Sequence, residues 1–120
     1  MQQITIPPLA KGETYIGAIG DKDGDVYHVI LLPGDNDDSD WQAALDWAKS
    51  IGGELPTRRE QSLLFANAKD AFHPDWYWSG ELYASDASYA WCQTFRGGYQ
   101  DGSHLGDSCR ARAVRRLIIE

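Results

Sequence analysis

Long apolar runs are missing from this 120-residue sequence. No stretch approaches the roughly 20 apolar residues that a membrane-spanning helix needs. The first nine residues also lack the basic region followed by an apolar stretch that marks an export signal. These absences predict a chain that stays in the cytoplasm and has no membrane partner.

Cysteine is scarce, with only Cys92 and Cys109. The two could pair if they lay on neighbouring strands, but a chain without an export signal keeps its thiols reduced. We expect free thiols that pack as small apolar side chains. His28, His73 and His104 lack the close spacing of zinc ligands, and the cysteines are not closely paired, so no metal site is predicted.

Catalytic and phosphate-binding motifs are also missing. There is no Gly-x-Ser-x-Gly elbow and no cysteine in a recognisable catalytic setting, and the glycines near residue 20 have the wrong spacing for a phosphate loop. The segment 21–25 begins like a calcium-binding EF-hand loop, but the twelfth position is Leu32 rather than Glu. The sequence therefore predicts neither an enzyme nor a cofactor.

Acidic residues dominate the charge, which is −7 overall. This balance disfavours direct binding to nucleic acid, which needs a basic face. We expect Arg110, Arg112, Arg115 and Arg116 to face outward and pair with the acidic first half of the chain. Four loop acids offer oxygens for a calcium ion, but a solvated acidic loop is the simpler interpretation; they are Asp35, Asp37, Asp38 and Asp40.

Aromatic residues are abundant, with five Trp, six Tyr and three Phe in a chain that is 42% hydrophobic. They supply enough buried area to offset chain entropy, so residues 1–120 should form one compact domain.

The first half of the chain predicts a β-hairpin followed by two helices. A short strand at 4–6 should end at Pro7-Pro8, and strands at 15–19 and 26–32 should flank a tight turn. After an acidic loop at 33–40, helical spacing begins near Trp41 and stops at Gly52-Gly53. Thr57 followed by Glu60 predicts a capping box for a second helix, over residues 58–71.

The second half predicts strands, at residues 76–79, 89–95 and 113–119. The connection at 96–108 is rich in glycine and polar residues and is predicted to be a long exposed loop. An aromatic side chain beside donors and acceptors suits both a sugar face and a protein hot spot. The predicted ligand-binding residues in this loop are Tyr99, Gln100, Asp101, Ser103, His104 and Asp107, with an ordinary solvated loop as the alternative.

Several short motifs occur in one order along the chain: Trp41 with Ala44 and Ala48, Gly53-Glu54-Leu55-Pro56-Thr57-Arg58, Tyr77-Trp78-Ser79, Ala90-Trp91 with Phe95, and Arg110 to Arg116. In these motifs the chain resembles the phage and prophage Lcl C-terminal type domain, of the C-type-lectin-like superfamily. The resemblance implies an α+β fold with two helices packed on small antiparallel β-sheets and a long polar loop before the last strand. Relatives of this fold bind glycans or proteins through late loops, and the resemblance implies no reaction. It also implies that Trp41, Trp78 and Trp91 are core residues, because they match core positions of the family.

Three functions are therefore considered. The first is a non-catalytic phage or prophage binding module for a protein or glycan, in the host cytoplasm or incorporated into a virion. The second is a small acidic inhibitor of a host defence system such as CRISPR, which docks on a basic nucleic-acid channel. The third is an enzyme related to the formylglycine-generating branch, which is disfavoured because its paired cysteines are close in sequence whereas Cys92 and Cys109 are seventeen positions apart.

Overall fold

The computed structural model describes residues 1 and 3–119, which form an α+β domain with two helices and two small sheets. The elements are β1 (Thr14–Gly20), β2 (Val26–Leu31), β3 (Asn36–Ser39), α1 (Trp41–Ser50), α2 (Arg58–Ala68), β4 (Trp76–Leu82), β5 (Tyr89–Thr94), β6 (Gln100–His104), β7 (Cys109–Ala111) and β8 (Val114–Ile118). No helix among the described residues has the length and apolar character needed to cross a membrane.

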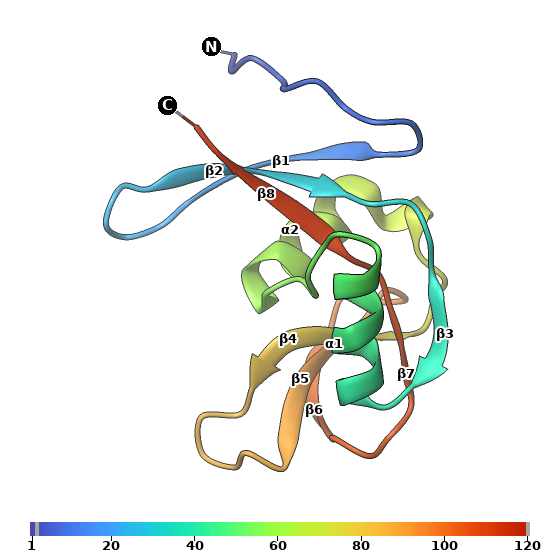
Figure 1. Ribbon diagram of the computed structural model, residues 1–120. Helices are drawn as coiled ribbons and strands as arrows, with labels where there is room; N and C mark the ends of the chain where they lie inside the picture. The colour runs from blue at the N-terminus through green and yellow to red at the C-terminus, as the bar shows by residue number, and fades with distance from the viewer. Residues whose placement is uncertain (2, 120) are drawn as a thin grey trace.

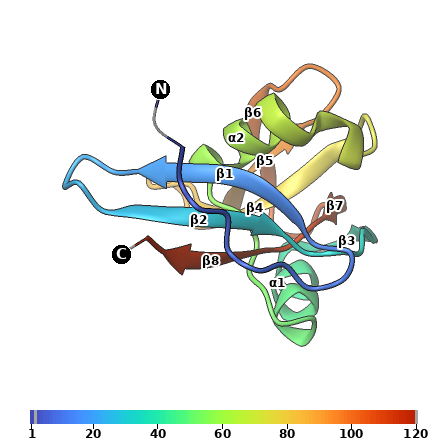
Figure 2. The ribbon, with the colours of Figure 1, turned by 90° about the horizontal axis from the view of Figure 1, so that it is seen from above.

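The first sheet joins the two ends of the chain, in the order β1-β2-β8 with antiparallel pairs (Figure 1). The predicted hairpin of β1 and β2 is confirmed. Its turn is held by the carboxylate of Asp21, whose Oδ1 accepts from the amides of Asp23 at 2.9 Å and Asp25 at 3.0 Å. Seen from above, β8 runs alongside β2, and the first residues of the chain cross the outer side of this sheet (Figure 2).

The second sheet has five strands in the order β3-β7-β4-β5-β6. Its pairs are antiparallel except that of β4 with β7, which is parallel and paired at Tyr77 and Arg110. The three predicted strands of the second half are confirmed as β4, β5 and β8. Strand β6 forms one edge of this sheet, and its outer side is open to solvent among the described residues.

The two helices begin where local capping signals predict. The side chain of Asp40 accepts from the amide of Ala43 at 2.8 Å, and Gly52 ends α1 with a φ of 84°, a conformation that disfavours other residues. Thr57 and Glu60 form the complete capping box of α2. Helix α2 ends at Ala68, and the predicted last turn is a 3₁₀ turn at Lys69–Ala71.

Three predictions of local structure are wrong. Residues 4–6 form no strand, because they lie outside the hydrogen-bonded ladder of β1 and because Pro7-Pro8 offers no amide donors. Strand β3 lies inside the predicted acidic loop, paired with β7, and strand β6 lies inside the predicted late loop, paired with β5. These polar segments are strands because main-chain hydrogen bonds to a neighbour hold them, whatever their side chains.

The core is divided into two clusters. One gathers Trp78, Cys92 and Cys109 with the small alanines of α1, and the other gathers Tyr77, Phe95 and Leu64 with the hairpin. Trp78 is fully buried as predicted, whereas Trp41 and Trp91 are partly exposed. Helix α2 packs on β1 of the first sheet and on β4 and β5 of the second. It therefore connects the two sheets (Figure 1).

Candidate functional site

The six predicted contact residues are near one another in sequence but do not converge on one point. Residues alternate between faces along a strand, and β6 pairs with β5 at Gln100–Gln93, Gly102–Trp91 and His104–Tyr89. Ser103 is on the opposite face, where its Oγ is 3.4 Å from the sulfur of Cys92.

Gln100 has a structural role in this arrangement. Its side-chain amide donates to the carbonyl oxygen of Arg58 at 2.8 Å and to Oε1 of Gln93 at 2.9 Å, and its own Oε1 accepts from Nε of Arg58 at 3.0 Å. Gln93 is fully buried. Gln100 therefore ties the start of α2 to the sheet, and little of its hydrogen-bonding capacity is left for a ligand.

Tyr99 and Asp107 are at opposite ends of β6. Tyr99 is 74% exposed, without an aromatic neighbour among the described residues. Asp107 accepts from the amide of His104 at 3.0 Å and so closes the turn that follows β6. Both residues are exposed, but only Tyr99 offers an aromatic surface of the kind that dominates protein interfaces.

The structure instead brings together an aromatic surface on the β5–β6 face. Tyr83 packs on Trp91 with ring centroids 4.3 Å apart and on Tyr89 at 5.9 Å, and His104 meets Tyr89 edge-on at 5.7 Å. At the inner end, the guanidinium carbon of Arg58 is 3.5 Å from the ring centroid of Trp91. We call Tyr83, Tyr89, Trp91, His104 and Arg58 the aromatic ledge.

Gly102 makes the ledge possible. A Cβ atom at this position would be 2.3 Å from Cζ of Tyr83, so any other residue would displace the ring. Partial burial and the nearby carboxylate of Asp101 raise the pKa of Tyr83, and its hydroxyl donates to Oδ1 of Asp101 at 3.5 Å. Of the predicted residues, His104 belongs to the ledge, and Asp101 lies at its rim.

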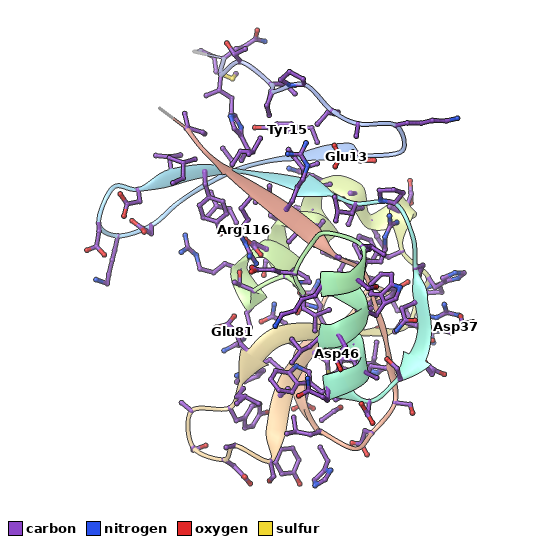
Figure 3. All side chains as sticks on the ribbon, in the orientation of Figure 1. Glu13, Tyr15, Asp37, Asp46, Glu81 and Arg116 are labelled. Atoms are coloured by element: carbon purple, nitrogen blue, oxygen red, sulfur yellow. The ribbon has the colours of Figure 1, made fainter. Side chains whose placement is uncertain are left out.

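The rim of the ledge is acidic. Among the described residues, Glu81, Asp86 and Asp101 form no ion pair. Glu81 accepts from the amide of Arg58 at 2.5 Å at the start of α2, and hydrogen bonds from Ser88 lower the pKa of Asp86. Figure 3 shows Glu81 at the end of β4, away from Arg116. The rim therefore carries three carboxylates beside the single guanidinium of the ledge, that of Arg58.

The arginines of the C-terminal region are unavailable to neutralise it. Arg110 pairs with Asp35 at 3.2 Å, Arg115 with Glu13 at 2.7 Å and Arg116 with Glu60 at 2.6 Å, which confirms the predicted pairing for these three. Arg112 is the exception, because its guanidinium donates to the carbonyl oxygens of Ala71 and Leu32, both at 2.7 Å.

A cleft adjoins the inner end of the ledge. Its volume is 490 Å³, and its lining includes Arg58, Arg59, Ser62, Glu81 and Gln100. The backbone carbonyl of Gly20 accepts from Arg59, so this side chain bridges the cleft to the hairpin. Ledge and cleft together offer aromatic, cationic and anionic groups side by side.

Sequence reasoning found only part of this surface. Tyr89 and Trp91 alternate on β5, a pattern that indicates a shared face, but the motif resemblance assigned Trp91 to the core. Tyr83 carries no sequence signal, since its position depends on Gly102 of a different strand. Neither the family models nor the curated proteins with which the chain was compared match it.

Proposed function

We propose that this chain is a non-catalytic binding module of the C-type-lectin-like class and that it recognises a protein through the aromatic ledge. The observation that carries the proposal is the ledge itself, in which the exposed Tyr89 and His104 adjoin the partly exposed Tyr83 and Trp91 beside Arg58. Tyrosine, tryptophan and arginine are the residue types that dominate the energetics of protein interfaces.

A protein fits this surface better than a glycan. A sugar ring stacks on an unobstructed aromatic face, but the guanidinium of Arg58 covers a face of Trp91, and the Tyr83 ring lies against Gly102. The ledge rings also contact one another edge-on or tilted, which gives a broad surface rather than a single platform. Such a surface is suited to burial under a partner of similar extent.

The order of elements supports the proposed fold class. The hairpin, the two capped helices, the aromatic strands and the closing strand occur in the order that the resemblance implies, with strands β6 and β7 in place of most of the expected long polar loop. The change from the sequence-based proposal is the location of the contact: it lies on the face of β5 and β6 and on Tyr83, not on a loop at 97–108.

The second candidate is an acidic inhibitor of a host defence system that docks on a basic channel. The unpaired carboxylates of Glu81, Asp86 and Asp101 around the ledge favour it, together with the net charge of −7. An acidic aromatic surface complements a basic protein, and attraction of this kind weakens as salt rises.

The test is an affinity pull-down from host lysate with the wild type, a Tyr83→Ala/Tyr89→Ala double variant and a Tyr99→Ala control. We expect one stoichiometric protein that the wild type and the control retain and that the double variant loses. Tyr99 is an exposed aromatic residue outside the ledge. If the Tyr99→Ala variant lost the partner and the double variant retained it, the contact would lie in the segment 97–108 instead.

Two further measurements separate the candidates. Elution of the partner as salt rises favours the inhibitor, whereas retention at high salt favours a binding module with an apolar contact. A glycan array probed with the same three proteins tests the alternative ligand class. Binding to a glycan that depends on Tyr83 and Tyr89 would overturn the assignment of a protein partner.

A further inference from the structure

The side chains of the two cysteines lie on the same face of the second sheet, opposite the side chain of Tyr77. Cys92 on β5 is 1% exposed and Cys109 on β7 is 5% exposed, and both are free thiols in the same core cluster. Tyr77 of β4 pairs with Gln93 on one side and with Arg110 on the other. Cys92 precedes Gln93, and Cys109 precedes Arg110. Because neighbouring residues of a strand point to opposite faces of the sheet, both thiols point to the face opposite the Tyr77 side chain.

Both cysteines line one surface cleft, so their thiols face the same space. The cleft has a volume of 280 Å³, and its lining includes Trp76, Ser103 and Asp107. Ser103 Oγ is 3.4 Å from the Cys92 sulfur, and that thiol donates to the carbonyl oxygen of Asp101 at 3.3 Å. The cleft gives a small ion a route to both sulfurs.

A disulfide does not suit this placement. Strand β4 separates β5 from β7, so the two backbones are two inter-strand spacings apart, about 9.5 Å. Disulfides usually span Cα separations of about 4.4–6.8 Å. An ion between the sulfurs spans the larger separation without moving a strand.

The donor set selects the kind of ion. Among the described residues no group of three or more His, Cys, Asp and Glu side chains is placed to hold a metal, so the four ligands of structural zinc are missing. Thiolates are soft ligands that select monovalent copper. We propose that Cys92 and Cys109 form a two-coordinate site for a soft monovalent metal ion, of which Cu(I) is the physiological case.

Binding replaces the two thiol protons by one Cu(I), with the oxidation state unchanged. Two protons go to solvent and two copper–sulfur bonds form. Because both sulfurs must be deprotonated, affinity rises with pH. The ion also links β5 to β7 across β4, so it stabilises the folded chain by mass action. This inference is independent of the proposed protein partner.

The test is a competition titration of the full, reduced chain with Cu(I) and a Cu(I)-specific chelator, without oxygen. We expect one ion per chain and a higher Tm with copper. Cys92→Ser and Cys109→Ser should each lose about 100-fold or more in affinity, because each removes one arm of a chelate. Ser108→Ala, which alters the same cleft but no sulfur, is the matched control and should bind like the wild type.

Several results would overturn the proposal. One is a single-cysteine variant, shown by circular dichroism to be folded, that binds Cu(I) as tightly as the wild type. Another is X-ray absorption of the wild-type complex that shows nitrogen or oxygen ligands instead of two sulfurs, a readout that does not depend on any variant folding. A third is mild oxidation of the folded chain to an internal disulfide with loss of two hydrogen masses, since it would show that the backbones approach closely enough for a direct bond.

Discussion

The carboxylate of Glu60 on α2 lies against the guanidinium of Arg116 on β8, with Nε–Oε2 at 2.6 Å and Nη2–Oε1 at 2.7 Å. Glu60 is fully buried, and it also accepts from the hydroxyl of Tyr27 at 2.7 Å and from the amide of Thr57 at 2.9 Å. In Figure 3, Arg116 points from β8 toward α2. One carboxylate thus links the helix cap, the hairpin and the closing strand.

The charge on Glu60 is kept by its partners. Burial alone would raise the pKa of Glu60, but hydrogen bonds from Arg116, Thr57 and Tyr27 bring it below its usual value. Glu60 in turn raises the pKa of Arg116. The pair therefore stays ionised inside the domain at neutral pH.

Breaking this pair should be costly. We expect Glu60→Gln to lower the free energy of unfolding by about 3–5 kcal/mol, because it leaves the Arg116 guanidinium without its buried counter-charge. The measurement is urea unfolding. Glu54→Gln is the matched control: Glu54 contacts the same guanidinium but is 66% exposed, so its loss should cost less than about 1 kcal/mol. Equal costs would contradict the buried pair's role.

Acid should weaken the link between Glu13 and Arg115. Hydrogen bonds from Arg115 and from the amide of Ala10 lower the pKa of Glu13 from 4.5 to about 2 in the folded chain. A lowered folded pKa means that the stabilisation is complete above pH 4.5 and is lost as pH falls toward 2. Chemical unfolding at a series of pH values over this window measures the effect. The free energy of unfolding of Glu13→Gln should fall less with pH than that of the wild type, and an equal fall in both proteins would refute the prediction.

Two adjacent glycines should differ in their tolerance of alanine. A Cβ at Gly53 would be 2.8 Å from the carbonyl oxygen of Val114 and 2.5 Å from Cδ1 of Leu32, so Gly53→Ala must push β8 away and should cost about 3 kcal/mol. Gly52 has open space and a φ of +84°, so Gly52→Ala should cost only about 1–2 kcal/mol of backbone strain. Chemical denaturation compares them, and a reversed order would be inconsistent with the packing described.

The ledge can be disturbed from beneath. In Gly102→Ala the new methyl group displaces the Tyr83 ring, which is the movable end of a partly exposed side chain, so the Tm should change little. Binding of the captured partner should fall by about tenfold or more, as for loss of an interface hot spot. Calorimetry with the purified partner measures this, with Gly20→Ala in the hairpin as control, where an added Cβ has only the carbonyl oxygen of Asp25 nearby, at 3.9 Å. Unchanged affinity would place the contact elsewhere.

The local features of this protein can be predicted from its sequence. Asp40 and the Thr57–Glu60 pair fix the starts of the helices, and Gly52 ends α1, because each acts within a few residues. The hairpin turn at 21–25 is equally local. The pattern of apolar residues also predicts a domain of mixed helices and strands, since these residues recur at helical spacing in some segments and at strand spacing in others.

The contacts between distant residues depend on how the whole chain folds. Strands β3 and β6 are polar and exist because β7 and β5 supply main-chain partners, a relation without a sequence signature. The Tyr83 ring lies against Gly102, and Cys92 and Cys109 line one cleft from strands on either side of β4, because of the order of strands in the sheet. Both candidate sites arise from long-range packing, whose free energy comes from burial of the whole core rather than from the residues of either site.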